Sequence, residues 1–291
     1  MSSSMFSSME MAAPDAILGL NAAFNSDENP NKINLGVGVY KDETGITPIL
    51  ECVKQAERML MESENSKSYL GIDGLPEYAK LVRQTLFGRD VDVSPMVTLQ
   101  TPGGTGALRV AGDFLKSKVG ASRIWLSNPT WANHGAVFSA AGLVTDSYRY
   151  LGECGKALDF TGMMESIAAI PAGDVICLHA CCHNPTGVDP TVEQWSEIAA
   201  ACATGGVLPL IDFAYQGFAN GIREDAAALQ PFLSSGNEFM VCSSFSKNFG
   251  LYAERVGALT IVSQDSATAA VTLSHAKKAV RTNYSNPPKH G

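Results

Sequence analysis

The residues best suited to chemistry in this chain are an acid, a phenol and a lysine that follow apolar stretches. Asp212 and Tyr215 close the run VLPLIDFAY, and Lys247 closes the run FMVCSSFSK. A lysine amine forms a Schiff base with an aldehyde, and a carboxylate stabilises a protonated ring nitrogen. Taken singly, the acid could cap a helix and the lysine could be a solvated loop residue. Their chemistry becomes informative only if the fold brings them together.

A glycine-rich turn is a candidate anion site. The segment TPGGTG at 101–106 follows an apolar strand pattern and precedes a helical one. Glycines let backbone N–H groups at the start of a helix approach a phosphate closely. A tight strand-to-helix connection explains the same turn equally well, and the turn matches neither a Walker A nor a GxGxxG pattern. Nucleotide binding therefore has no specific support.

The elements that must position these groups alternate along the chain. Seven short apolar segments with strand patterns are separated by segments with helical spacing, after a short leading helix expected over 14–26. The expected strands cover 96–101, 123–128, 143–150, 174–180, 207–214, 239–245 and 255–262. This alternation predicts an α/β fold, a mostly parallel sheet flanked by helices. The acid, the phenol, the lysine and the glycine turn then share the sheet edge where such folds bind ligands.

Composition excludes several classes of protein. The 291 residues carry a formal net charge of −8 and hydrophobic residues make up 45%, which is globular usage and argues against nucleic acid as a partner. No apolar run approaches the roughly 20 residues of a membrane span. The first basic residue is Lys32, so an Arg-rich mitochondrial presequence is not expected. We expect a cytoplasmic protein with no membrane or nucleic-acid partner.

The seven cysteines are scattered and show no disulfide framework, which favours a reducing compartment. Cys181, Cys182 and His183 stand together at the end of an expected strand. They lack the paired spacing of a zinc site, and no second cluster completes one. We therefore expect no metal and interpret the two cysteines as small buried side chains.

An amine, a carboxylate and an anion-binding turn at one edge are what pyridoxal phosphate requires. Eight motifs surround these residues in order: NLGVGVYKDETG (34–45), SYLGIDGL (68–75), TPGGTGALR (101–109), NPTWANH (128–134), HACCHNPTGVDPT (179–191), IDFAYQGF (211–218), SSFSKNFGLYAERVGAL (243–259) and RTNYSNPPKHG (281–291). The series resembles the class I pyridoxal-phosphate aminotransferases, specifically the aspartate aminotransferase group. Close relatives in that group act on aromatic amino acids.

The resemblance covers roughly residues 14–291 and implies the fold-type I architecture, with a mostly parallel seven-stranded sheet. It implies an N-terminal arm and part of a small domain over 1–40, and a large cofactor-binding domain over 41–291. The rest of the small domain, with an arginine that binds the substrate α-carboxylate in the family, is expected to be absent from this chain.

The resemblance also implies roles around the cofactor ring. Lys247 would bind the cofactor covalently and shuttle the proton at the substrate Cα, and Asp212 would pair with the ring nitrogen. Tyr215 and Asn184 would hydrogen-bond the phenolic oxygen, so that the covalent link reacts near neutral pH. Trp131 would stack on the ring.

Further contacts are implied for the phosphate and the substrate. Phosphate contacts would come from Gly104, Thr105, Ser244, Ser246, Arg255 and, across a dimer interface, Tyr69. Substrate contacts would come from Gly38, Trp131, Asn184 and the partner subunit's copy of Arg281, which would bind a distal carboxylate. A solvated arginine at a helix end is the alternative for Arg281. His134 would lie behind Asp212, although a packed core histidine fits nearly as well.

The implied activity is reversible amino-group transfer between aspartate or glutamate and 2-oxo acids such as oxaloacetate and 2-oxoglutarate, by a homodimer with shared sites. Two alternatives stay open. One is an aromatic-amino-acid aminotransferase of the same family. The other is a truncated protein that binds pyridoxal phosphate without full activity.

Overall fold

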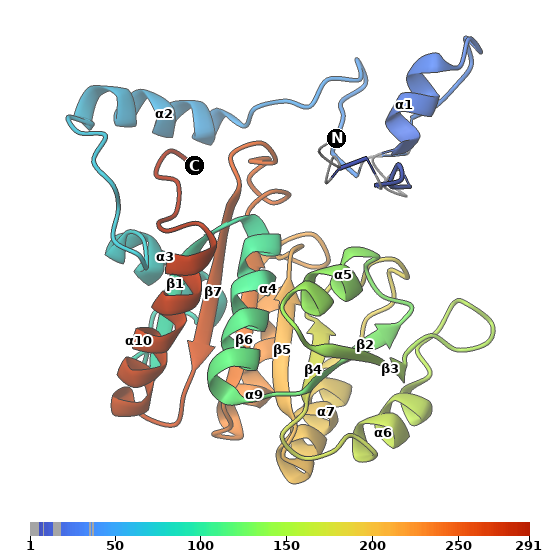
Figure 1. The fold of residues 1–291 in the computed structure, drawn as a ribbon, viewed down its shortest axis with the longest axis vertical. Coiled ribbons are helices and arrows are strands. Elements are labelled where there is room, and N and C mark those ends of the chain that lie inside the picture. The colour runs from blue at the N-terminus through green and yellow to red at the C-terminus, as the bar shows by residue number, and fades with distance from the viewer. Residues whose placement is uncertain (1–5, 8, 14–18, 35, 37) are drawn as a thin grey trace, which may run out of the picture. The chain divides into compact units, whose positions relative to one another are not determined.

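The computed structural model describes residues 6–7, 9–13, 19–34, 36 and 38–291 (Figure 1). The chain divides into two compact units, Met1–Pro48 and Ile49–Gly291. In the first unit, α1 (Gly19–Ser26) forms the second half of the helix expected over 14–26, whose residues 14–18 lie outside the described ones. The boundary expected between residues 40 and 41, and the small-domain assignment, stay predictions.

The second unit is built on one seven-stranded sheet. Its strands are β1 (Met96–Pro102), β2 (Arg123–Asn128), β3 (Val144–Arg149), β4 (Val175–His179), β5 (Leu208–Phe213), β6 (Phe239–Ser244) and β7 (Val256–Val262). Their order is β1-β7-β6-β5-β4-β2-β3, and only β7 runs antiparallel to its neighbours. Every segment expected to be a strand forms one. The predicted α/β fold with a mostly parallel seven-stranded sheet is confirmed.

Helices cover both faces of this sheet (Figure 1). The helices of this unit are α2 (Glu51–Ser63), α3 (Pro76–Phe87), α4 (Gly103–Phe114), α5 (Asn133–Ala140), α6 (Phe160–Ala168), α7 (Val192–Gly205), α8 (Ile222–Asp225), α9 (Gln230–Ser234) and α10 (Ser266–Asn283), of which α2 buries no residue. α4, α5 and α10 pack on one face, and α3, α6, α7 and α9 pack on the other. No helix in the described part of the chain is long and apolar enough to cross a membrane.

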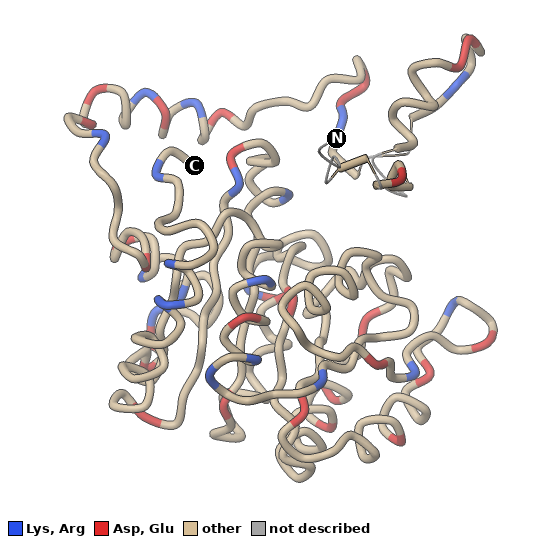
Figure 2. Tube along the Cα trace, in the orientation of Figure 1, with Lys and Arg blue, Asp and Glu red and all other residues tan. Residues whose placement is uncertain are grey.

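Side-chain alternation along the strands divides the core into two layers. On β6, Phe239 and Val241 belong to the cluster with α7 and α9, whereas Met240 and Cys242 belong to the cluster with α4 and α10. A strand covered on both faces must be apolar on both. β4, β6 and β7 accordingly carry no charged residue, and Figure 2 shows the charges mainly outside the central strands. Asp212 on β5 is the exception, and its burial needs an explanation.

α4 and α7 begin in different ways. α7 has a capping box, in which Thr191 Oγ1 accepts the Gln194 N–H while the Gln194 side chain accepts the Thr191 N–H. α4 begins at Gly103 after Pro102, and no side chain caps it. The first N–H groups of α4 therefore remain available to an anion.

Glycines allow the start of α4 to lie directly against β7. A Cβ on Gly257 would stand 2.4 Å from the carbonyl carbon of Gly103 and 2.8 Å from the nitrogen of Gly104. Gly103 itself has a φ of +73°, and a Cβ there would stand 2.4 Å from Arg255 Nη2. Only residues without side chains permit these approaches. The turn thus brings a helix N-terminus and a guanidinium side by side, which a simple connection would not require.

Candidate active site

The carboxyl ends of neighbouring strands bring most of the candidate residues to one edge of the sheet. Asp212 lies near the end of β5, where it is in register with His179 of β4 and Cys242 of β6. Lys247 lies three residues beyond the end of β6, and Asn184 lies five residues beyond the end of β4. Ligands of open α/β sheets bind at this edge. The region around Asp212 and Lys247 is therefore the candidate active site.

Asp212 is a buried and ionised carboxylate. Its side chain is 11% exposed, and Oδ2 lies 3.0 Å from Nε2 of the fully buried His134. Burial alone would raise the pKa of Asp212. The hydrogen bond from His134 and the nearby charges, including that of Lys247, outweigh burial and hold this pKa below its ordinary value. Asp212 is negatively charged at neutral pH.

A chain of hydrogen bonds sets the direction in which His134 donates. The Asn184 N–H donates to His179 Nδ1 at 3.3 Å, so His179 carries its proton on Nε2. That N–H donates to Thr130 Oγ1 at 3.4 Å, and the hydroxyl is left to donate to His134 Nδ1 at 2.8 Å. His134 then donates from Nε2 to Asp212. The chain runs from a backbone amide to the carboxylate and keeps Asp212 an acceptor.

His179 in this chain and the neighbouring His183 are both uncharged at neutral pH. Burial lowers the pKa of His179 to about 4 and that of His183 to about 3. The His183 ring is stacked between Tyr150 and His179, with ring centroids 3.9 Å and 4.1 Å away. Among the residues that the structure describes, no group of His, Cys, Asp and Glu could hold a metal ion.

Lys247 lies over the aromatic ring of Tyr215. Its Nζ is 4.6 Å from the ring centroid, and Asn184 Nδ2 donates to the Tyr215 hydroxyl at 3.4 Å. Burial lowers the pKa of Lys247; Asp212 opposes this effect and Arg255 adds to it. A lowered pKa increases the share of neutral amine, which is the nucleophilic form. Burial raises the pKa of Tyr215, so its phenol keeps a proton that it can donate.

The anion site consists of hydroxyls and a guanidinium beside the start of α4. Ser244 Oγ lies 3.2 Å from Ser246 Oγ, and Arg255 Nη1 donates to Ser246 Oγ at 3.4 Å. A Cβ on Gly104 would stand 3.0 Å from Ser244 Cβ, so the helix start lies close to Ser244. Thr105 is in the first turn of α4 and is half-buried.

These charges fit a ligand with a phosphate and a basic ring. Arg255 has no carboxylate partner among the described residues, and it lies beside the positive end of the α4 dipole. Two positive features in contact are unfavourable unless an anion lies between them. The ionised Asp212 suits a cationic ring nitrogen, and Lys247 suits an aldehyde. Trp131 lies edge-on to His134, the residue that contacts Asp212, with ring centroids 5.3 Å apart. The residues present fit pyridoxal phosphate.

Tyr69 and Arg281 lie together on another surface. They line a hollow of about 820 Å³ with Lys67, Lys289 and other residues. Tyr69 is 93% exposed, and Arg281 in the last turn of α10 is also exposed. No hydrogen bond or ion pair joins either residue to the Asp212 region in the described part of the chain. Gly38 belongs to the first unit, whose placement relative to this site is not determined.

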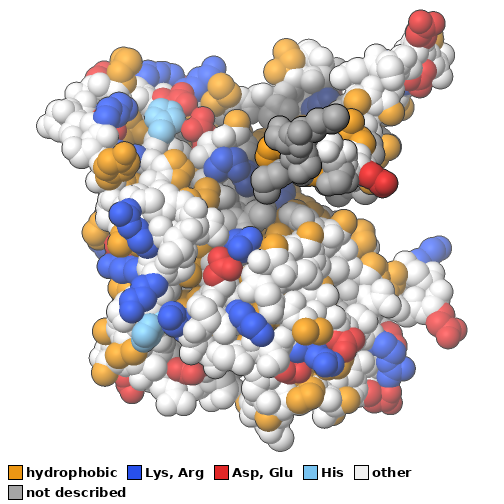
Figure 3. Space-filling model, in the orientation of Figure 1, with side chains coloured by type: hydrophobic (Ala, Val, Ile, Leu, Met, Phe, Trp, Pro, Cys, Tyr) orange, Lys and Arg blue, Asp and Glu red, His pale blue; other side chains and the backbone are white. Residues whose placement is uncertain are grey.

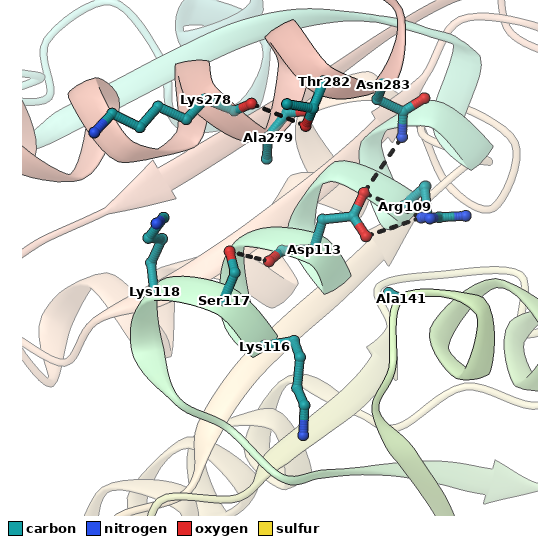
Figure 4. A pocket seen from close by; sticks show the side chains of 10 residues that line it. All are labelled: Arg109, Asp113, Lys116, Ser117, Lys118, Ala141, Lys278, Ala279, Thr282 and Asn283. Carbon is teal, nitrogen blue, oxygen red and sulfur yellow. Dashed lines mark hydrogen bonds and ion pairs between the residues drawn. The ribbon is translucent and has the colours of Figure 1, made fainter.

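A hollow of about 600 Å³ lies between α4 and α10, where Lys and Arg side chains gather on the surface (Figure 3). Arg109 pairs with Asp113 on the same helix, α4, at 3.0 Å, while the side chains of Lys116 and Lys278 extend in different directions (Figure 4). Lys116 and Lys118 belong to a π-helical turn, Leu115–Val119, that extends α4, where cations offset the helix dipole. This explanation is sufficient, and we assign the hollow no ligand.

Thr130 and His179 had no role in the sequence analysis, although both stand in motifs quoted there. Thr130 precedes His134 by four residues, a spacing that places two side chains on one face of a helical turn. That spacing is the signal that could have found Thr130. His179 is found only through the register between β4 and β5, which a single sequence does not reveal.

Comparison with known proteins identifies the family that this geometry fits. Residues 30–291 match the family described as aminotransferase class I and II. The aspartate aminotransferase of Escherichia coli (strain K12) is 52% identical over 290 residues, which cover 99% of this chain and 73% of that protein. The cytoplasmic aspartate aminotransferase of Oryza sativa subsp. japonica is 43% identical, over 100% of this chain and 72% of that protein.

A solved structure shows the same fold with a cofactor attached. The aromatic-amino-acid aminotransferase of Burkholderia pseudomallei, covalently bound to pyridoxal phosphate, superposes with a TM-score of 0.95. It is 43% identical to this chain, and the match covers 99% of this chain and 73% of that one.

Replacing the donor to Asp212 tests whether the hydrogen-bond chain keeps this carboxylate charged. His134→Phe keeps a ring but removes the N–H, so burial raises the pKa of Asp212. A carboxyl with a depressed folded-state pKa stabilises the fold above its unfolded pKa, and this contribution is lost as the pH falls. The variant should therefore be less stable by about 1–3 kcal/mol near pH 6, and the difference should shrink toward about pH 3.

Urea unfolding across that pH range measures the effect. His275→Phe is the matched control, because His275 lies on α10 and its buried Nδ1 has no hydrogen-bond partner in the described structure. In the control, the loss of unfolding free energy relative to the wild type should not increase as the pH rises from about 3 to 6. A stability loss in His134→Phe that stays constant from about pH 3 to 6 would contradict the electrostatic role.

Proposed function

The chain belongs to the class I and II aminotransferases, and from this we propose that it transfers amino groups reversibly between aspartate or glutamate and 2-oxo acids. It is a pyridoxal-phosphate-dependent transaminase. The observation that carries the proposal is the buried, ionised Asp212 beside Lys247, at an edge that also holds an uncapped helix start and Arg255, which has no carboxylate partner among the described residues. The names of the E. coli and rice relatives support aspartate as a substrate.

We assign the residues to the cofactor as follows. Pyridoxal phosphate, when bound, supplies an aldehyde for amines and a ring that accepts the electron pair released at the substrate Cα. Asp212 pairs with the ring nitrogen and keeps it protonated. Trp131 packs on the ring, and Tyr215 and Asn184 bind the phenolic oxygen. The phosphate is held by Gly104, Thr105, Ser244, Ser246 and Arg255.

Lys247 has two tasks in this assignment. Its amine attaches the cofactor, and after substrate has replaced it, Nζ takes the proton from the substrate Cα. Both tasks need the amine without its extra proton, which the lowered pKa favours. The neighbouring Tyr215 ring, 4.6 Å away, limits where Nζ can lie. The geometry therefore keeps the Lys247 amine close to its working position.

The protein acts as a homodimer with shared sites in this proposal. Tyr69 would reach the partner's phosphate site, and Arg281 would bind the distal carboxylate of the substrate in the partner's site. The support is that both side chains are exposed and line one hollow. An exposed pair on one surface is placed for contact with a second copy of the chain. Gly38 would contact the substrate through its backbone.

Aromatic amino acids define the second candidate function. The close match to the aromatic-amino-acid aminotransferase of B. pseudomallei favours it, because that protein shares this fold at 43% identity. The presence of Arg281 in this sequence does not by itself separate the two candidates. Substrate kinetics must do so.

We also propose a cytoplasmic location. The seven free cysteines and the name of the rice relative, a cytoplasmic aspartate aminotransferase, support it.

Arg281→Ala tests the substrate class. Losing a charge-assisted pair in a closed site should slow the reaction with aspartate by about one to two orders of magnitude. An aromatic amino acid has no distal carboxylate, so its rate should fall far less. Cofactor absorbance with each amino acid alone measures the half-reaction, and Lys278→Ala on the same helix is the control. Equal losses for aspartate and phenylalanine would show that Arg281 is structural.

Mixing two variants that are each strongly impaired with aspartate tests the shared site. Lys247→Ala lacks the amine, and Arg281→Ala lacks the arginine that reaches across to the partner. Subunit exchange between them should produce heterodimers in which one of the two sites has both residues. Aspartate transamination should then return, up to about a quarter of the wild-type level if exchange is random and each such site works normally. Complete absence of recovery, with heterodimers verified by mass spectrometry, would refute the shared arrangement.

A further inference from the structure

Asp225 is a buried carboxylate outside the group assigned to the cofactor. It is the last residue of α8, is 5% exposed, and has no ion pair with any described residue. Its Oδ2 accepts the N–H groups of Gly217 at 2.8 Å and Ala219 at 3.1 Å, and its Oδ1 accepts that of Asn220 at 2.8 Å. Three backbone donors in one turn thus converge on one anion. Without the carboxylate, this turn would leave three N–H groups unpaired.

The turn that Asp225 holds begins directly after the Tyr215 phenol. The Phe218 N–H donates to the Tyr215 carbonyl at 3.0 Å, which closes the turn on Tyr215. The Cys181 thiol lies 3.4 Å from the same carbonyl and 3.6 Å from Asp225 Oδ2. Asp225 is therefore connected to the Tyr215 backbone in two ways, through the turn that the Phe218 N–H closes and through the Cys181 thiol. Neither connection includes a residue that the proposed function assigns.

The other side of the turn is connected to the lysine segment. The Gln216 carbonyl accepts Asn248 Nδ2 at 3.2 Å, and Asn248 follows Lys247 directly. Gln216 is itself buried, and its Nε2 donates to the carbonyls of Thr85 and Ile222, each at 2.9 Å. The turn is thus fixed on both sides. Rotation of the Tyr215 backbone would have to break one of these connections.

We propose that Asp225 is a positioning residue for Tyr215: by holding the turn 217–220 it keeps the phenol against Asn184 and beside Lys247. This inference rests on the proposed function, because the phenol matters only if it donates to the cofactor's phenolic oxygen. Gly217 has a φ of +99° and Gly221 a φ of +147°. Glycine populates many backbone conformations about equally, so the local sequence alone does not hold the turn in this conformation. Such a turn needs an external anchor, and the carboxylate supplies it.

Asp225→Asn replaces an acceptor oxygen by an N–H donor and so weakens the anchor at nearly constant volume. A phenol that donates to an anionic oxygen favours the anionic form. If Tyr215 moves away, the visible absorbance of the bound cofactor should titrate at a pH higher by about 0.5–1 unit. Asp92→Asn is the matched control, since Asp92 also accepts a backbone N–H, from Ser94, but precedes the opposite end of β1. The absorbance titration of Asp92→Asn should have the same midpoint pH as that of the wild type.

A Tyr215→Phe background separates positioning from general loop stability. With the phenol absent, Asp225→Asn should add no further shift, whereas an effect independent of Tyr215 would add in full. If Asp225→Asn does not fold, Asp225→Glu moves the carboxylate by one methylene and should shift the midpoint in the same direction. A folded Asp225 variant with an unchanged midpoint, or an equal shift in both backgrounds, would overturn the inference. A wild-type protein that shows no cofactor absorbance would instead refute the proposed function.

Discussion

A charge buried at the end of a central strand is the constraint on which the rest of this structure depends. β5 lies in the middle of an apolar sheet, yet it carries Asp212 with an exposed fraction of only 11%. An unpaired carboxylate at that depth would take up a proton or destabilise the fold. The chain of donors through His134, Thr130 and His179 prevents this. Because Thr130 and His134 follow β2 whereas His179 ends β4, these strands must be in place before the charge can be kept.

The positive charge is arranged at a separate place on the same edge. Gly257 and Gly103 let the uncapped start of α4 meet β7 and the Arg255 guanidinium. Negative charge at Asp212 and positive charge at Arg255 together select a ligand that carries both signs, such as a cofactor with a basic ring and a phosphate. Lys247, with its pKa lowered by burial, adds the reactive amine. Asp212 and Arg255 thus select the cofactor by charge, whereas Lys247 attaches it.

Much of the fold follows from the sequence because its causes are local. The seven apolar segments became seven strands, and strand order along the chain was enough to place Asp212 and Lys247 at one edge. The stretch between β5 and β6 does not form one continuous helix and is divided into α8, the 3-10 turn Ala226–Leu229, and α9. Pro231 has no N–H to continue a helix, and the Asp225 side chain turns back to the preceding loop. The position of His179 depends on the register between β4 and β5, and the hydrogen bonds that Asp225 accepts depend on the backbone conformation of 217–220. Neither could be predicted from a single sequence.

The central claim is that Lys247 and Asp212 belong to one cofactor site, with Lys247 as the point of attachment. The most direct measurement is borohydride reduction of the protein with bound pyridoxal phosphate, followed by digestion and mass spectrometry of the peptides. The account predicts a phosphopyridoxyl group on Lys247 and on no other lysine. A label on a different lysine, or no label on a protein that retains the cofactor, would contradict it.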